Sequence, residues 1–528
     1  MAAVLVAVLA LPFLCLGLAT EARAHATLVS AEPADNEVLQ TAPTRLTLRF
    51  SEPVKLMSLS LAAPTGETVA LKGAEVDGTD VSVAVPANMA EGTHAIRYRI
   101  VSADSHPVGG SVLFSVGAPS GTPGRGDAPD WPVAALVFSS KLLLYLGLFV
   151  GIGGLAYGAA IQPFESAARR VVRVFLVLGL VAVPVALAAQ GLDALGASIG
   201  AFFQPDSWAA GAETSFGRTL GIAAVSFLLG LAAAFLPGGR IGTVLAGLSF
   251  LGAGLSLAAS GHASAAPPQW ATRPAVFLHT LAIAFWVGSL LPLALAIQGG
   301  REEGRAALKR FSAAIPFVLL ALVASGVLLG VVQVREPDAL FDTAYGWVLV
   351  AKLGLVSLLL LLAAANRWSL TPAVAGGADR TVRERMVGLI GMELALVLLV
   401  LAVVAFWRFT PPPRALQEAA RQPAVAYLVT GRLAAEVTLR PGRAGPVEAS
   451  AALSTIDYVP IDPKGVTFVF TDPAGRVPPV RQAGVRSGNG LWQANAALPV
   501  PGRWQVWLEV GDNRVELEKV EGTIDVRP

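Results

Sequence analysis

The sequence predicts a polytopic α-helical membrane protein with one all-β domain before its membrane part and another after it in the sequence. Of its 528 residues, 54% are hydrophobic and only 14% are charged, and the mean hydropathy is +0.62, which is more apolar than a soluble globular protein. Between Trp131 and Trp407 lie eight apolar runs, each long enough to cross a bilayer. Alternating apolar and polar residues between Pro- and Gly-rich turns flank this region on both sides and indicate short β-strands.

The first 24 residues have the pattern of a secretory signal. An apolar run from Leu5 to Leu18 is followed by Ala22-Arg23-Ala24, a small-residue cleavage site. We expect cleavage after Ala24, which makes His25 the first residue of the mature chain. The one cysteine, Cys15, lies within this leader, so the mature chain should contain no disulfide, zinc–thiolate site or iron–sulfur cluster.

Residues 25–117 should form a small extracytoplasmic β-sandwich of the cupredoxin or immunoglobulin type, with a barrel as the alternative. Its apolar residues recur at every second position, as expected for antiparallel strands with one buried face. The alternating sets are Leu46, Leu48 and Phe50; Val81, Val83 and Val85; Ile96, Tyr98 and Ile100; and Val112, Phe114 and Val116. The Gly- and Pro-containing segment 118–130 is typical of a flexible linker.

The membrane domain, residues 131–409, should contain eight spans, with both ends of the chain outside the cytoplasm. The loops after spans one, three, five and seven carry twelve arginines and lysines, whereas the opposite loops and span edges carry three. Because positive loops face the cytoplasm, this orientation agrees with the signal and predicts a multi-pass protein of the bacterial inner membrane. The expected spans are approximately 133–160, 171–191, 215–236, 241–260, 274–298, 310–333, 345–365 and 386–408.

A second β-sandwich should follow a short linker at 410–422. Within residues 423–528, the segments Val466 to Thr471, Leu491 to Leu498 and Arg503 to Val510 have strand patterns and are separated by Asp-Pro and Pro-Gly turns. This domain contains no His, Cys or Met. It therefore offers no soft-metal site.

Three residues of the N-terminal domain offer ligands for Cu(II): His25, Asp104 and His106. After cleavage, His25 could chelate a metal through its α-amine and its imidazole. Asp104 and His106 lie two residues apart after a predicted strand, so their side chains would share one face. Nitrogen donors with one carboxylate suit tetragonal Cu(II). Glu52 is either an outer partner that orients a ligand imidazole or an ordinary turn residue, whereas His94, within a strand, should be structural.

Two histidines mark a candidate transport route through the membrane domain. His262 lies at the outer end of span four, and His279 lies about one and a half turns inside span five. Ionisable residues inside a membrane are costly and usually functional, so we expect both to receive an ion at the extracytoplasmic mouth. The alternative is that His279 makes a packing hydrogen bond and His262 caps a loop. Lys352 and Glu393, in spans seven and eight, should neutralise each other as a buried structural pair.

Two classes of function are excluded by what the sequence lacks. No G-x-x-x-x-G-K-[ST] segment is present, so a nucleotide-driven pump is not expected. The formal net charge is +2, and no basic block stands apart from the membrane-flanking loops, so nucleic acid is not an expected partner.

Several of these segments resemble a known family. The stretches HATLVSAEPADNEVL, LRFSEPV and YRIVSADSHPVGGSVLFSV are similar to the copper-binding CopC family, and SGHA, FLHTLAIAFWVGSLLP, YGWVLVAKLGL and MELAL are similar to CopD. The last domain resembles YtkA/FixH-like modules more weakly. The resemblance implies that His25, Asp104 and His106 bind Cu(II), and that the membrane part moves copper, mostly inward.

We therefore expect a protein of copper homeostasis or resistance that captures Cu(II) outside the cytoplasm and passes it to its membrane domain for import. The expected partners are the copper ion and membrane lipid, and a periplasmic cuproprotein or copper chaperone stays open. Cu(I) is left open for the membrane domain only, because no Met cluster exists. We do not expect an enzyme. The alternatives are a non-transporting assembly factor that delivers copper to a cuproprotein, and a histidine-brace copper oxidase, against which the carboxylate of Asp104 argues.

Overall fold

The computed structural model divides the chain into a helical unit and a unit that contains both β regions. The helical region and each of the two β regions have an apolar core of their own. The structure describes residues 28–33, 37–50, 53–86, 89–102, 107–118, 120, 130–236, 239–405, 407, 410, 412–414, 417, 423–430, 432–455, 459–487, 490–511 and 518–527.

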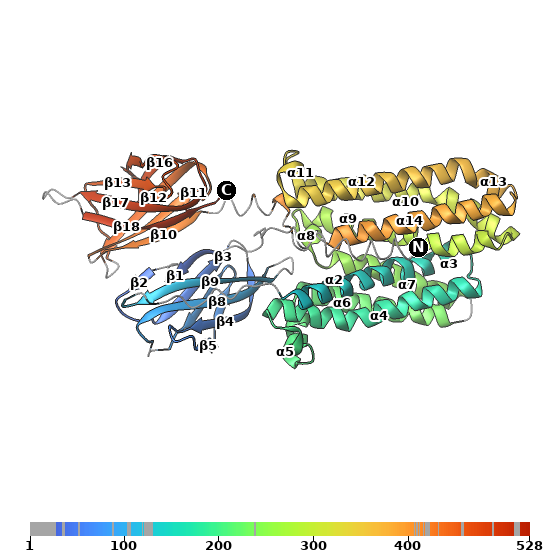
Figure 1. The fold of residues 1–528 in the computed structure, drawn as a ribbon, viewed down its shortest axis with the longest axis horizontal. Helices are drawn as coiled ribbons and strands as arrows, with labels where there is room; N and C mark the ends of the chain where they lie inside the picture. Colours follow the sequence, from blue (N-terminus) through green and yellow to red (C-terminus); the bar gives the residue numbers. More distant parts are fainter. Residues whose placement is uncertain are drawn as a thin grey trace. The chain divides into compact units, whose positions relative to one another are not determined.

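The N-terminal β region is a sandwich of two sheets (Figure 1). One sheet has the strand order β1-β3-β7-β6 and the other the order β2-β9-β8-β4-β5. One pairing differs from the antiparallel expectation, because β2 runs parallel to the end of β9. The strands are β1 (Leu28–Glu32), β2 (Glu37–Leu39), β3 (Arg45–Phe50), β4 (Val54–Ala62), β5 (Thr68–Ala70), β6 (Glu75–Asp77), β7 (Asp80–Ala84), β8 (Gly92–Ser102) and β9 (Pro107–Val116).

The alternating apolar residues fill the space between these two sheets, as the sequence predicts. Leu46, Leu48 and Phe50 of β3 are all buried, while the residues between them are more exposed. They pack in one cluster with residues of β8 and β9, such as Ile100 and Phe114. Burial on one face only is what gives a strand its period of two.

Eight helices of the described chain are long and apolar enough to cross a membrane (Figure 1). They run over Trp131–Ala160, Ser166–Leu195, Ser215–Phe235, Arg240–Ala258, Gln269–Gln298, Glu302–Val334, Ala344–Ala375 and Arg380–Ala405, so each predicted span has a helix. The first span contains α2 (Trp131–Leu146), a π-helical segment (Gly147–Ile152) and α3 (Gly153–Ala160), and the seventh contains α12 (Ala344–Ala365), a second π-helical segment (Asn366–Leu370) and α13 (Thr371–Ala375).

The other spans are single helices, and short α-helices lie in the described connections, beside a 3₁₀ turn at Ile199–Ala201. The spanning helices are α4 (Ser166–Leu195), α6 (Ser215–Phe235), α7 (Arg240–Ala258), α9 (Gln269–Gln298), α10 (Glu302–Val334) and α14 (Arg380–Ala405). The connecting helices are α5 (Pro205–Glu213), α8 (His262–Ala265) and α11 (Ala339–Asp342).

Helix α9 is the most enclosed span. Of its most apolar stretch, 72% is buried, against 6% for the helix that starts with α12. Small residues permit this packing: a Cβ atom on Gly153 of α3 would lie 1.8 Å from the carbonyl oxygen of Ala284, and one on Gly288 would lie 2.2 Å from the backbone of Gly153. Such close backbone contact between small residues is how membrane helices associate.

The C-terminal β region is a second sandwich. Its sheets have the orders β10-β11-β12-β16-β15 and β14-β13-β17-β18, with antiparallel pairing throughout the described strands. The predicted strands correspond to β13, β16 and β17. The full set is β10 (Ala424–Val429), β11 (Leu433–Arg440), β12 (Gly445–Thr455), β13 (Gly465–Thr471), β14 (Val480–Ala483), β15 (Val485–Arg486), β16 (Trp492–Leu498), β17 (Gly502–Gly511) and β18 (Glu518–Val526).

Candidate functional site

The predicted Cu(II) ligands His25, Asp104 and His106, and the outer candidate Glu52, lie outside the residues that the structure describes. Their roles therefore stay predictions. Within the described ranges, no group of three or more His, Cys, Asp or Glu side chains is arranged to hold a metal ion.

The described strands that flank the predicted ligands meet at one end of the N-terminal sandwich. Leu28, at the start of β1, pairs with Phe50, at the end of β3. Val54, which opens β4 in the other sheet, pairs with Ser102, at the end of β8. Strand β9 neighbours β8 and begins at Pro107. The chain thus reaches the same end of the domain next to residue 25, next to residue 52 and on both sides of residues 103–106.

An ion pair also lies at this end. Arg49 donates two hydrogen bonds of 2.9 Å from Nε and Nη2 to the two carboxylate oxygens of Asp80. These hydrogen bonds and the positive charge of Arg49 hold the pKa of Asp80 below its usual range, against a smaller opposing effect of burial. Asp80 is therefore an ionised carboxylate whose oxygens already have strong donors.

His94 lies at the other end of strand β8, near its start. Its ring is 1% exposed and stacks on Phe114 with the centroids 5.4 Å apart. Nε2 is 2.8 Å from the carbonyl oxygen of Ala90. Eight residues of extended strand separate His94 from Ser102, about 27 Å. These contacts are those of a core residue, in agreement with the structural role expected of it.

His279 of α9 is the membrane histidine with the best-defined surroundings. Its Nδ1 atom is 3.2 Å from the carbonyl oxygen of Leu322 and 3.0 Å from Oγ of Ser325, both on α10. A backbone carbonyl only accepts hydrogen bonds, and the Ser325 hydroxyl already donates to the carbonyl of Ala321 at 2.7 Å. Nδ1 must then carry the proton, which leaves Nε2 with a free lone pair.

His279 is farther from the start of its helix than predicted. Helix α9 begins at Gln269, five residues before the expected span, because Pro274 is accommodated inside the helix instead of starting it. His279 is therefore ten residues from the helix start, about 15 Å, and not one and a half turns.

His262 opens the short helix α8, and its backbone is tied to α10. The side-chain amide of Gln333 donates a 2.9 Å hydrogen bond to the carbonyl oxygen of His262, and Gln333 is itself buried. Ser325 and Gln333 are eight residues apart on α10, about 12 Å along its axis. The two histidines therefore contact α10 at different levels, with His262 nearer the end where α10 finishes. The sequence pattern did not identify Ser325 and Gln333, because these contacts depend on tertiary packing.

The prediction that Lys352 pairs with Glu393 is wrong. Lys352 Nζ lies over the ring of Trp407, 4.7 Å from its centroid. Glu393 instead accepts a 3.0 Å hydrogen bond from the side-chain amide of Asn366. Lys352 and Asn366 are separated by fourteen residues of one helix, about 21 Å, so the two charges lie at different depths and each has its own partner.

Comparison with known families places named domains on most of the chain. Residues 28–117 match the model of the CopC domain. Residues 129–272 match the N-terminal domain of the copper resistance protein D-like family, and residues 305–407 match copper resistance protein D. The likeness of the C-terminal sandwich to YtkA/FixH-like modules stays a prediction.

Three known proteins are similar to this chain over these regions. The copper transport protein CutJ of Bacillus subtilis (strain 168) is 27% identical over 416 residues, which cover 74% of this chain and 75% of CutJ. The inner membrane protein YebZ of Escherichia coli (strain K12) is 28% identical over 50% of this chain and 94% of its own length. Copper resistance protein C of Pseudomonas syringae pv. tomato is 35% identical over 18% of this chain and 82% of its own length. The chain belongs to the CopC–CopD family of copper resistance and transport proteins and carries both domains in one polypeptide.

Proposed function

We propose that this protein captures Cu(II) outside the cytoplasm with its CopC domain and transfers it to the CopD-like helices for import. In this proposal, the α-amine and imidazole of His25, the carboxylate of Asp104 and the imidazole of His106 bind the ion, and Glu52 orients one of the imidazoles. Copper is the substrate. The signal pattern and the arginine-rich odd loops favour an inner-membrane protein with both termini extracytoplasmic.

The strand register supports the soluble site. At one end of the sandwich, Leu28 pairs with Phe50 in one sheet and Val54 pairs with Ser102 in the other. Each of these residues is within three residues of a proposed ligand or of Glu52. His25, Glu52 and the Asp104–His106 pair are far apart in sequence, so they can share one site only if the fold brings their neighbours together. An amine, two imidazoles and a carboxylate then supply the four donors of a tetragonal Cu(II) ion.

The same donor set favours holding copper over oxidising a substrate with it. Oxygen activation at a copper–histidine site needs an open coordination position, which the carboxylate of Asp104 would fill. An anionic oxygen ligand also stabilises the divalent ion over Cu(I). We therefore propose binding and transfer without an enzymatic step.

His279 is the proposed acceptor within the membrane domain. Its protonated Nδ1 is held by Leu322 and Ser325, and its Nε2 makes no hydrogen bond with any described residue. A ligand imidazole is commonly fixed in this way, by a hydrogen bond from the nitrogen that does not face the metal. His262, tied to α10 through Gln333 nearer the extracytoplasmic end in this topology, is the proposed earlier contact. A direct hand-off between them would have to bridge the separation along α10.

The test is cellular copper content in a strain that expresses the full chain. His279→Asn keeps an N–H group near the position of Nδ1 but removes the nitrogen at Nε2, whereas His279→Gln keeps a polar group near Nε2 and loses the Nδ1 contact. We expect His279→Asn to reduce copper accumulation to the level of the empty strain. Thr280→Ala, at the next buried position of α9, is the matched control and should accumulate copper normally.

If His279→Asn transports normally, the histidine is a packing residue and the proposed route is wrong. If removal of the whole gene leaves cellular copper unchanged but deprives an extracytoplasmic cuproprotein of its metal, import is wrong and the protein is an assembly factor.

A further inference from the structure

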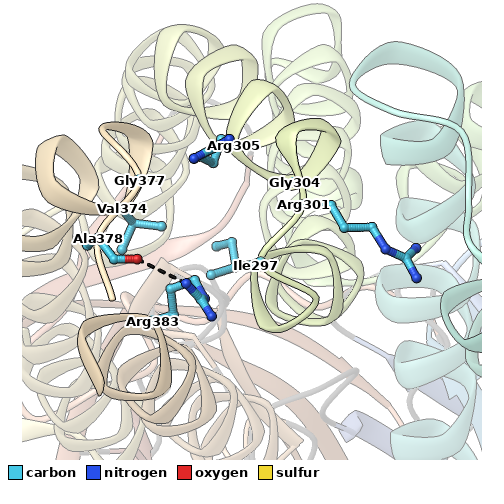
Figure 2. Close-up of a pocket in the computed structure, with 9 residues that line it drawn as sticks. Ile297, Arg301, Gly304, Arg305, Val374, Gly377, Ala378 and Arg383 are labelled. Atoms are coloured by element: carbon cyan, nitrogen blue, oxygen red, sulfur yellow. Dashed lines mark hydrogen bonds between the residues drawn. The ribbon is translucent and has the colours of Figure 1, made fainter. Parts of the chain in front are cut away.

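A small cavity with two arginines lies at the end of the helical bundle that carries the arginine-rich loops (Figure 2). It is bounded by the end of α9, the first turns of α10, and the connection from α13 to α14. Ile297 and Val374 form apolar parts of its wall, and its enclosed volume of about 10 Å³ has room for one water-sized group. Both loops that border it follow odd-numbered spans, so they share one face of the membrane.

Three arginines border the cavity, but one of them is directed elsewhere. Arg301 pairs with Glu165 at 3.0 Å, and in Figure 2 its guanidinium points away from the cavity. Arg305, on α10, and Arg383, on α14, remain. They come from different helices and bring two guanidinium groups to one small space.

Both of these arginines have a buried donor with no acceptor. Arg305 uses Nη2 for an ion pair with Glu302, and Arg383 uses Nη1 for a 2.9 Å hydrogen bond to the carbonyl oxygen of Ala378. Nε of each is buried and has no hydrogen-bond partner among the described residues. No described carboxylate pairs with Arg383. An unsatisfied buried N–H of a charged group is unfavourable, and both arginines that carry one line the same cavity.

Two glycines let the arginines approach the loops. Gly300 and Gly377 have φ angles of +67° and +94°, which favour glycine. A Cβ atom on Gly377 would lie 2.8 Å from Nη1 of Arg305, and one on Gly300 would lie 3.0 Å from Nη2 of Arg383. Each arginine is thus packed against a loop of the opposite side of the cavity.

We propose that this cavity binds an oxygen of an anionic phosphate group, with Arg383 as the main donor and Arg305 as the second. A phosphate oxygen fits a space for one water-sized group, while the rest of the phosphate stays at the mouth. Guanidinium groups recognise phosphate through charge-assisted hydrogen bonds. The shared chemistry is found in an anionic lipid headgroup and in inorganic phosphate. Basic pockets between membrane helices on the cytoplasmic side are suited to lipid headgroups.

The test uses the full chain, purified in detergent and stripped of lipid. Native mass spectrometry measures binding of phosphatidylglycerol, with phosphatidylcholine as the zwitterionic comparison, and thermal unfolding measures the effect of inorganic phosphate. We expect Arg383→Gln to weaken phosphatidylglycerol binding about tenfold, the lower end of what one charge-assisted hydrogen bond contributes, and Arg305→Gln to weaken it less, because Glu302 already neutralises Arg305. Arg385→Gln is the matched control: Arg385 is exposed and does not line the cavity.

The two measurements together identify the source of the phosphate group. Stabilisation by millimolar inorganic phosphate that disappears in Arg383→Gln indicates a soluble anion, and dependence on Arg383 for phosphatidylglycerol alone indicates a lipid. Arg383→Lys keeps the charge and loses the planar fork, so it should fold normally and bind more weakly than the wild type. Equal binding by the wild type, Arg383→Gln, Arg383→Lys and Arg305→Gln would overturn the proposal and leave a water site. The outcome is independent of copper transfer.

Discussion

The two β-sandwiches of this chain have separate cores of the same kind and differ in what lies at their ends. In both, alternate residues of two sheets close a single apolar cluster. Each also has a carboxylate clamped by an arginine: Asp80 by Arg49 between strands, and Asp472 by Arg476 within a turn. Only the N-terminal sandwich has histidines next to the strand ends, and the C-terminal one has none at all. The core therefore sets the fold, whereas the residues where strands end set the chemistry.

The largest expected effect is a loss of stability of the C-terminal sandwich that leaves copper binding by the N-terminal sandwich unchanged. Trp504 is fully buried and its Nε1 donates to the carbonyl of Val500 at 3.0 Å. Trp504→Ala should destabilise the C-terminal sandwich by about 3–5 kcal/mol, seen as increased proteolysis of that region. The exposed Val485→Ala is its control. Copper binding should not change, and loss of copper in Trp504→Ala would mean that the two sandwiches form one binding unit.

The next effect concerns the proposed ligands of the N-terminal sandwich. His106→Ala should weaken Cu(II) binding by about 100-fold or more, since even residues that only orient a ligand contribute 10- to 100-fold. Glu52→Gln should weaken it about tenfold if Glu52 orients an imidazole. Competition titration of the mature protein against a Cu(II) chelator measures both. An unchanged affinity in His106→Ala would exclude this residue as a ligand.

A substitution at His94 should change the stability of the N-terminal sandwich without changing its affinity for copper. His94→Ala removes the hydrogen bond to Ala90 and the stacking on Phe114, so it should destabilise the N-terminal sandwich by about 1–3 kcal/mol. Cu(II) affinity should stay at the wild-type value, because His94 and the proposed site lie at opposite ends of β8. Denaturant unfolding and chelator competition on the same sample distinguish the two effects. A fall in affinity without a fall in stability would make His94 part of the metal site.

The smallest effect is a pH dependence of the stability of the C-terminal sandwich. Hydrogen bonds from Arg476 to the buried carboxylate of Asp472 lower its pKa from 3.8 to about 2. A depressed pKa adds stability that is complete above the unfolded value and is lost as pH falls from about 4 to about 2. Asp472→Asn should lower the unfolding temperature at pH 7 and remove this dependence. A wild-type pH profile in the variant would show that the ion pair does not stabilise the fold.

Elements with a strong pattern could be predicted from the sequence, and contacts between elements could not. Alternation identified Leu46, Leu48 and Phe50 as a buried strand face, and apolar length identified all eight spans. The start of α9 was predicted too late, because a proline such as Pro274 marks a helix end only when neighbouring helices do not support it. The predicted pairing of Lys352 with Glu393 was wrong for another reason, because two charges in adjacent spans can pair only when they lie at the same depth.

The candidate site was partly predictable for the same reason. The four residues proposed to bind Cu(II) or to orient its ligands follow from their types and positions in the sequence. The tautomer of His279 depends on Leu322, forty-three residues away. The cavity that Arg305 and Arg383 line forms where two loops meet. In the sequence, the arginines of these loops indicated only which side of the membrane the loops face. Neither contact leaves a local pattern.

The central claim is that processing makes His25 the first residue and that its α-amine joins His106 and Asp104 on Cu(II). The most direct measurement is the electron paramagnetic resonance spectrum of the mature, copper-loaded protein, taken with its N-terminal sequence. We expect a chain that begins at His25 and a tetragonal, nitrogen-rich Cu(II) signal that His25→Ala abolishes. A mature chain that keeps the leader, or an unchanged signal in His25→Ala, would contradict the claim.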